Sequence, residues 1–263
     1  MQLFRSLLFI PGNQTKMLQK ASGFQPDVYV PDLEDSVADT DKSDARKIVA
    51  ENLKLFTNSN KLVIPRVNAL ETGLLELDIS ALIKNGIDGI SVGKIHTPDD
   101  IKQIDKYITK CEIEFNIKKG SIFLIPWIET ASAVLNSNQI LTSSERIIAA
   151  AFGAEDFTND MGIERMSDDT EIAFAKNYVA ISARASNIIA LDNPFFDFKN
   201  SPRLINNSLE SKKIGYKGKF AIHPAQIDDI NKSFSPTILE IKHAQQIIST
   251  FEKAVKEGRG STS

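Results

Sequence analysis

Eight short apolar runs recur along the chain, each followed by loop residues and then by a longer segment with helical periodicity. Runs of this length that are apolar on both faces predict the strands of a parallel sheet covered by helices. Segments 80–88, 98–111 and 170–186 show the helical pattern and have plausible caps. The predicted strands are residues 6–10, 28–33, 62–67, 89–93, 122–128, 146–152, 187–191 and 219–222.

About eight βα units in 263 residues predict a (β/α)8 TIM barrel, and we expect residues 1–263 to form one domain. A doubly wound open sheet uses the same alternation of elements and is the alternative. No G-x-G-x-x-G follows any predicted strand, which argues against the dinucleotide-binding version of that sheet. No linker rich in Ser, Gly or Pro divides the chain.

The composition excludes several classes of partner. The net charge of −3 gives no general attraction to nucleic acid or to anionic lipid. No apolar run approaches the roughly 18 residues of a membrane span, and the apolar stretch near the N-terminus is interpreted as a strand rather than a signal peptide. The only cysteine, Cys111, cannot form an internal disulfide, which fits a reducing compartment. We therefore expect a cytoplasmic protein with neither nucleic acid nor membrane as a partner.

Titratable side chains stand at seven of the eight predicted strand ends, where the active site of a barrel lies. Several carboxylates gathered at one mouth would repel one another unless a cation lay among them. Oxygen ligands suit Mg²⁺ or Mn²⁺ better than Zn²⁺. For any one acid alone, a solvated loop residue is an equally good interpretation. The acids are Asp32, Glu34, Asp35, Glu129, Glu155, Asp156 and Asp192.

The other candidate residues each have a structural alternative. Arg66 could hold a substrate carboxylate or an enolate oxygen, or could form a structural ion pair. Lys16 and Lys20 would share one face of a helix, which is more often a solvated face than a phosphate site. His223 precedes a proline turn and is interpreted as a structural histidine, and Trp127 as a core residue.

Several motifs occur in one order along the chain: DLED (32–35), PRVN (65–68), IET (128–130) and FGAEDF (152–157). In this combination the sequence resembles the citrate lyase β-subunit-like proteins of the HpcH/HpaI aldolase superfamily, over nearly its whole length. The resemblance implies a (β/α)8 barrel, commonly a homotrimer. It also implies that the protein breaks or forms carbon–carbon bonds in acyl-CoA thioesters with Mg²⁺.

Roles follow from this resemblance position by position. Glu129 and Asp156 match the Mg²⁺ ligands of the family, and Arg66 matches the residue that binds the substrate's oxygens. The DLED motif, with Asp32, would surround the metal site, and Glu34 and Asp35 would lie near metal-bound water. The remaining matches concern the ligand: Lys16 and Lys20 match CoA contacts, Phe9 stands where some relatives place tyrosine, and Ile222 and His223 match a stretch that lines the ligand.

The resemblance predicts a Mg²⁺-dependent lyase that cleaves a 3-hydroxyacyl-CoA, such as citryl-, citramalyl- or malyl-CoA, into acetyl-CoA and a 2-oxo acid. A CoA-independent aldolase acting on a 4-hydroxy-2-oxo acid is one alternative. A binding protein for a metal and an oxo acid or CoA ester, with little turnover, is another. Longer family members continue into a C-terminal lid that carries an aspartate, whereas this sequence ends at GRGSTS (258–263), so we expect a barrel without the lid.

Overall fold

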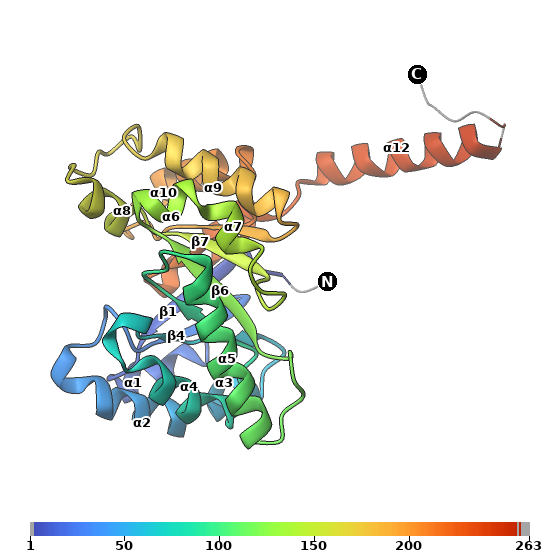
Figure 1. Cartoon of the computed structure of the whole chain (residues 1–263). Coiled ribbons are helices and arrows are strands. Elements are labelled where there is room, and N and C mark those ends of the chain that lie inside the picture. The colour runs from blue at the N-terminus through green and yellow to red at the C-terminus, as the bar shows by residue number, and fades with distance from the viewer. Residues whose placement is uncertain (1–2, 257, 259–263) are drawn as a thin grey trace.

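The computed structural model describes residues 3–256 and 258, and in it one parallel sheet closes on itself (Figure 1). β1 pairs with both β2 and β9, so the sheet forms a barrel with helices around it. The predicted (β/α)8 TIM barrel is therefore confirmed, and the open sheet is excluded. The strands are β1 (Ser6–Pro11), β2 (Val28–Asp32), β3 (Leu62–Val63), β4 (Arg66–Val67), β5 (Gly89–Val92), β6 (Phe123–Ile128), β7 (Ala149–Phe152), β8 (Ile189–Asp192) and β9 (Gly218–Ala221).

One predicted strand is interrupted. Residues 62–67 form two short strands, β3 and β4, which both pair with β2. Together they occupy one strand position of the eight-stranded barrel. Pro65 lies between them and has no backbone N–H to donate to a ladder, which accounts for the break. Arg66 pairs across to Asp32, so the strand resumes where the candidate site begins.

The helices surround the barrel, and their sequences explain where they begin. α5 begins with a capping box, in which Thr97 accepts from the N–H of Asp100 and Asp100 reaches back. The predicted helix at 80–88 was wrong at both ends, because Leu75 and Ile79 belong to the buried stripe and Gly86 turns the chain with φ of +83°. The helices are α1 (Thr15–Ala21), α2 (Lys42–Asn52), α3 (Lys54–Thr57), α4 (Leu75–Ile83), α5 (Pro98–Glu114), α6 (Ala131–Leu135), α7 (Ser137–Leu141), α8 (Ala154–Met161), α9 (Ala173–Ala185), α10 (Ser201–Lys213), α11 (Ile227–Phe234) and α12 (Ile238–Lys256), with 3-10 turns η1 (Asp39–Asp41), η2 (Leu70–Thr72) and η3 (Pro224–Gln226).

Alternation along the strands sorts side chains into two cores. One buried cluster contains Val30, Trp127 and Phe220 and fills the barrel, while a larger one lies between the strands and the helices. Side chains alternate along each strand, so the residue two positions after the last side chain inside the barrel also faces inward. At that point the strand has reached the barrel mouth. These next positions are Pro11, Asp32, Arg66, Gly93, Glu129, Gly153, Asn193 and Ile222.

The final helix departs from the barrel. α12 projects away from it as a single helix (Figure 1), and large apolar side chains such as Ile238, Leu239 and Phe251 are exposed along it. The expectation about the lid concerns residues beyond Lys256, of which only Gly258 lies within the described residues. Within the described part of the chain, no helix is long and apolar enough to cross a membrane.

Candidate active site

A cavity of ≈ 370 Å³ opens at the carboxyl ends of the strands. Seven of the eight inward positions at the barrel mouth line it, namely all except Gly93. Asp156 and Glu155 from the first turn of α8 complete one wall, and Phe9 and Trp127 form part of its apolar lining. The cavity therefore combines an apolar lining with a ring of charges where a barrel enzyme places its reacting groups.

Arg66 is held in one orientation by the DLED segment. Its Nε and Nη2 atoms donate to the two oxygens of Asp32, each at 2.7 Å. Its Nη1 atom donates to Asp35 at 2.7 Å and forms an ion pair with Glu34 at 2.9 Å. Since a guanidinium has five N–H groups, these contacts leave one Nη2 N–H for a ligand. The ring of Phe9 lies 4.5 Å from the guanidinium carbon and supports it from another side.

This cluster changes the acidity of its members in opposite directions. Burial alone would raise the pKa of Asp32, but the charge and hydrogen bonds of Arg66 hold it below its usual range. Burial raises the pKa of Glu34 even though Arg66 and Lys94 oppose the change. Lys94 donates to Glu34 at 2.9 Å, so Glu34 joins the two cations. The arrangement fixes Arg66 as a charged group at the mouth.

Glu129 is buried beneath the mouth, with 4 % of its surface exposed. Burial, followed by the nearby charge of Asp156, raises its pKa to about 8. Its Oε1 atom accepts a hydrogen bond from the backbone N–H of Lys94 at 2.5 Å. Glycines make room for it: a Cβ on Gly153 would come within 2.6 Å of the Cβ of Glu129, and a Cβ on Gly93 within 3.0 Å of Oε1. Glu129 is therefore held at a buried position where its ionised carboxylate is unfavourable unless a cation lies beside it.

Asp156 faces the same cavity from the first turn of α8, where a negative charge is favourable. Burial also raises its pKa. Among the described residues, its carboxylate receives no hydrogen bond and forms no ion pair. Two carboxylates of this kind, one buried and one half-buried, fit a divalent cation that would relieve their repulsion. No group of three or more His, Cys, Asp or Glu side chains within residues 3–256 could hold a metal, so the fit rests on a carboxylate pair, as is usual for Mg²⁺.

Asp192 does not join the other acids, which corrects the expected convergence of all the strand-end carboxylates. It follows the inward-facing Leu191 and therefore points outward, between the sheet and the helices. There it forms an ion pair with Lys176 of α9 at 2.8 Å and with Lys219 of β9. Ser211 of α10 donates to it at 2.6 Å. Asp192 is fully buried and has a structural role.

The other predicted ligand residues are distributed differently. Phe9 and Ile222 line the cavity. Lys16 and Lys20 are exposed on α1, directly after the first strand, and their side chains do not line it. His223 is also outside the cavity lining: its Nδ1 atom accepts from the backbone N–H of Ala225 at 3.2 Å, which caps η3, and its ring stacks on another aromatic ring.

Trp127 and Asn193 are among the residues at the mouth that are not predicted as site residues. Trp127 was assigned to the core, and although it is 4 % exposed it lines the cavity and donates from Nε1 to Ser91 at 2.8 Å. Asn193 directly follows Asp192 in the sequence. The alternation of β8 could have identified it, because Leu191 faces the barrel interior and position 193 must therefore face the mouth.

The chain resembles known proteins over most of its length. The model of the HpcH/HpaI aldolase/citrate lyase family matches residues 5–224. The citrate lyase subunit beta of Leuconostoc mesenteroides subsp. cremoris is 34% identical over 259 residues, which is 98% of this chain and 86% of the relative. The mitochondrial citramalyl-CoA lyase of Homo sapiens is 28% identical over 98% of this chain and 78% of its own length.

A solved structure shares the fold. The citrate lyase beta subunit of M. tuberculosis, complexed with oxaloacetate and magnesium, superposes with a TM-score of 0.74 at 22% identity, covering 89% of this chain and 98% of that one. The relatives named here are lyases or a subunit of one, as the sequence led us to expect. The match to the family model over most of the chain, together with identity above 30% to a citrate lyase subunit, shows that the chain belongs to the HpcH/HpaI aldolase/citrate lyase family.

Proposed function

We propose that the protein is a Mg²⁺-dependent lyase that cleaves a 3-hydroxyacyl-CoA, such as citryl-, citramalyl- or malyl-CoA, into acetyl-CoA and a 2-oxo acid. The observation that carries the proposal is the pairing of a buried carboxylate, Glu129, with Asp156 beside the fixed guanidinium of Arg66. The named relatives support the class of substrate, since they include a citrate lyase subunit and a citramalyl-CoA lyase.

Glu129 and Asp156 would hold the metal, in keeping with the magnesium in the M. tuberculosis structure. When bound, the metal would supply Lewis-acid polarisation of the oxygens of the oxo-acid half. Mn²⁺ has the same oxygen preference and could replace Mg²⁺. Gly93 and Gly153 give Glu129 the space to be oriented for this task.

Arg66 would act on the other half of the substrate. Its free Nη2 N–H points from a side chain whose orientation Asp32, Glu34 and Asp35 already fix. Once the hydroxyl proton is removed, the carbon–carbon bond breaks and the hydroxyl-bearing carbon becomes the carbonyl of the oxo acid. Negative charge then develops on the thioester oxygen of the departing enolate, which takes up a proton to give acetyl-CoA. A preorganised guanidinium stabilises such charge without reorganising during the reaction. Phe9 and Trp127 would limit water around these atoms.

The CoA part of the ligand would extend toward α1, where Lys16 and Lys20 are exposed on one helix directly after β1. This placement separates the proposal from its alternative, an aldolase that uses the same metal pair on a free 4-hydroxy-2-oxo acid. Only a CoA ester carries phosphates for the two lysines to meet.

The test is charge reversal at both lysines, Lys16→Glu with Lys20→Glu. We expect the KM for the thioester substrate to rise at least about tenfold, because two attractive contacts become repulsive, while kcat changes little. The matched control is Lys102→Glu with Lys106→Glu, also four residues apart, on α5. An unchanged KM in the α1 variant would favour the CoA-independent aldolase.

We also propose that copies of the chain associate, with a homotrimer as the expected form. α12 offers a surface for this, because it stands away from the barrel and exposes apolar side chains (Figure 1). An isolated helix of this length gains little stability without packing. A partner copy would cover those side chains.

A further inference from the structure

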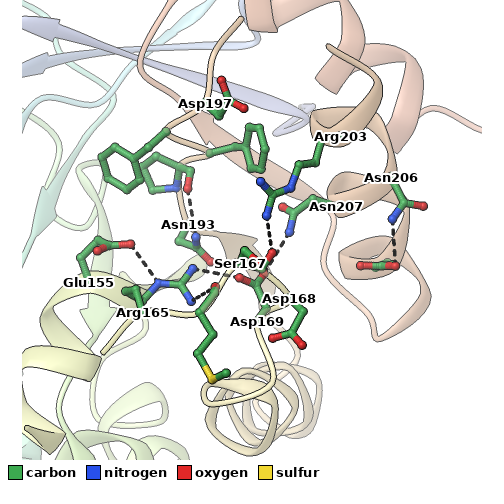
Figure 2. Close-up of a pocket in the computed structure, with 15 residues that line it drawn as sticks. Glu155, Arg165, Ser167, Asp168, Asp169, Asn193, Asp197, Arg203, Asn206 and Asn207 are labelled. Atoms are coloured by element: carbon green, nitrogen blue, oxygen red, sulfur yellow. Dashed lines mark hydrogen bonds and ion pairs between the residues drawn. The ribbon is translucent and has the colours of Figure 1, made fainter. Parts of the chain in front are cut away.

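A second cavity of ≈ 440 Å³ adjoins the central one, and we refer to it as the annex. It lies between α8, the loop around Arg165, the segment after β8 and α10 (Figure 2). The two cavities share part of their walls. The residues that line both are Glu155, Asn193, Pro194 and Phe196. A ligand in the central cavity therefore has these side chains between its reacting end and the annex.

Asn193, in the shared wall, has an unused acceptor. It is 5 % exposed, and its Nδ2 atom donates to the backbone oxygen of Pro194 at 3.0 Å, which fixes which end of the amide is the oxygen. Its Oδ1 atom is buried and receives no hydrogen bond from any described residue. Leaving such an acceptor unpaired costs about 1–3 kcal/mol. Asn193 thus has an acceptor without a described donor in the wall that the two cavities share.

A second amide in the annex has the same arrangement. The Nδ2 atom of Asn207 donates to Asp169 at 2.9 Å, and its Oδ1 atom is buried without a donor among the described residues (Figure 2). In the described part of this lining, the two buried side-chain atoms without a partner, Oδ1 of Asn193 and Oδ1 of Asn207, are therefore both acceptors. The annex therefore suits a group that donates hydrogen bonds.

The charges around the annex also favour a neutral hydrogen-bond donor over an anion. Arg165 is already engaged by Glu155 and Asp169, each at 2.9 Å, and by a third carboxylate, Glu171. Arg203 donates to the backbone oxygen of Ser167. Among the described residues, the lining holds five carboxylates and only these two arginines, so its net negative charge disfavours a further negative group. The five are Glu155, Asp168, Asp169, Asp197 and Glu210.

We propose that the annex is a specificity subsite, in which Asn193 accepts a hydrogen bond from a neutral donor on the far end of the oxo-acid half and the acidic lining disfavours a second carboxylate there. The inference rests on the proposed function, since it takes the central cavity to hold the oxo acid. It adds a substrate class to that function. The site should prefer oxo-acid halves that end in a hydroxyl, an amide or no polar group over those that end in a carboxylate.

The test compares three probes in the presence of Mg²⁺: oxaloacetate, its distal amide 2-oxosuccinamate, and pyruvate. Trp127 is the only tryptophan and lines the central cavity, so its fluorescence reports binding without turnover. Oxaloacetate and the amide have the same shape and differ in charge and in the donor. We expect the amide to bind about tenfold more tightly than oxaloacetate, with pyruvate between them.

The variant Asn193→Leu should remove the advantage of the amide over pyruvate, because the distal N–H of the amide then has no acceptor. Both should still bind more tightly than oxaloacetate, whose distal carboxylate still meets the acidic lining. The control is Asn177→Leu on α9, where the amide is exposed and donates to Ala173. Thermal melting of each variant checks folding, and Asn193→Ala serves if the leucine variant does not fold.

Each outcome separates the inference from the proposed function. Mg²⁺-dependent binding with oxaloacetate equal to or tighter than the amide would overturn the subsite and leave the lyase proposal standing. A preference for the amide over pyruvate that survives in both Asn193 variants would also overturn it, since Asn193 would then not be the acceptor. If none of the three probes bound with Mg²⁺, the proposed function itself would be contradicted, and the subsite with it.

Discussion

At the scale of single residues, the site depends on which side chain of each strand end faces inward. Asp192 and Asn193 are neighbours, yet one is fully buried against two lysines and the other faces the mouth. The roles of Arg66, Glu129 and Asp156 are predicted by the resemblance of their motifs to a family, because each side chain taken alone also has a structural interpretation. Asn193 could be predicted only by following the alternation of β8, since its chemistry alone is unremarkable.

The proposed role of Arg66 can be tested by its effect on kcat. Arg66→Ala should lower kcat on the true thioester by about 10²–10³, because a preorganised donor to the developing charge is lost. Arg66→Lys should restore little of this, since an ammonium cannot replace the paired contacts to Asp32. Steady-state kinetics on both variants, with Arg184→Ala on α9 as the control, measure this. A kcat for Arg66→Ala within threefold of the parent would rule out the role.

At the scale of elements, most strands and the parallel order could be predicted from apolar runs alone. The break between β3 and β4 needed Pro65 to be weighed against the run that contains it. The predicted start of α4 is wrong because only packing shows that Leu75 and Ile79 belong to the same buried stripe as Leu82. Local sequence gives the elements, and burial in the tertiary structure gives their bounds.

The buried cluster that joins β8, β9 and α9 gives a prediction about stability. Burial would raise the pKa of Asp192, but Lys176 and Lys219 lower it to about 2, from an ordinary 3.8. Asp192→Ala should therefore reduce the free energy of unfolding by about 3–5 kcal/mol at pH 7, because two buried ammonium groups lose their partner. Urea unfolding measures this, with Asp44→Ala, whose pair with Lys47 is exposed, as the control.

The pH dependence of that difference follows from the sign of the shift. Because the folded pKa lies below the unfolded one, the carboxylate contributes fully above about pH 3.8 and loses its contribution as the pH falls through about 2. The gap between parent and Asp192→Ala should therefore narrow between pH 4 and pH 2. A gap that stays constant over this range, or one below 1 kcal/mol at pH 7, would contradict the assigned role of the cluster.

At the scale of the whole molecule, the closed barrel brings residues from seven strand ends and one helix to a single mouth. Residues as distant in sequence as Phe9 and Ile222 line the same cavity there. Neither the cavity nor the annex could be predicted from the sequence, because both depend on how loops from different βα units pack. The family and the fold could be predicted, since the chain carries several motifs of the family in one order.

The most direct measurement of the central claim is acetyl-CoA release from citryl-, citramalyl- and malyl-CoA, each with Mg²⁺ and with EDTA. The account predicts cleavage of at least one thioester with Mg²⁺, its loss in EDTA, its recovery when Mg²⁺ is added back, and its absence in Glu129→Gln. Citryl-CoA, whose oxo-acid half ends in a carboxylate, should be the poorest of the three. Release that is insensitive to EDTA, or no release from any of the thioesters, would contradict a metal-dependent CoA-ester lyase.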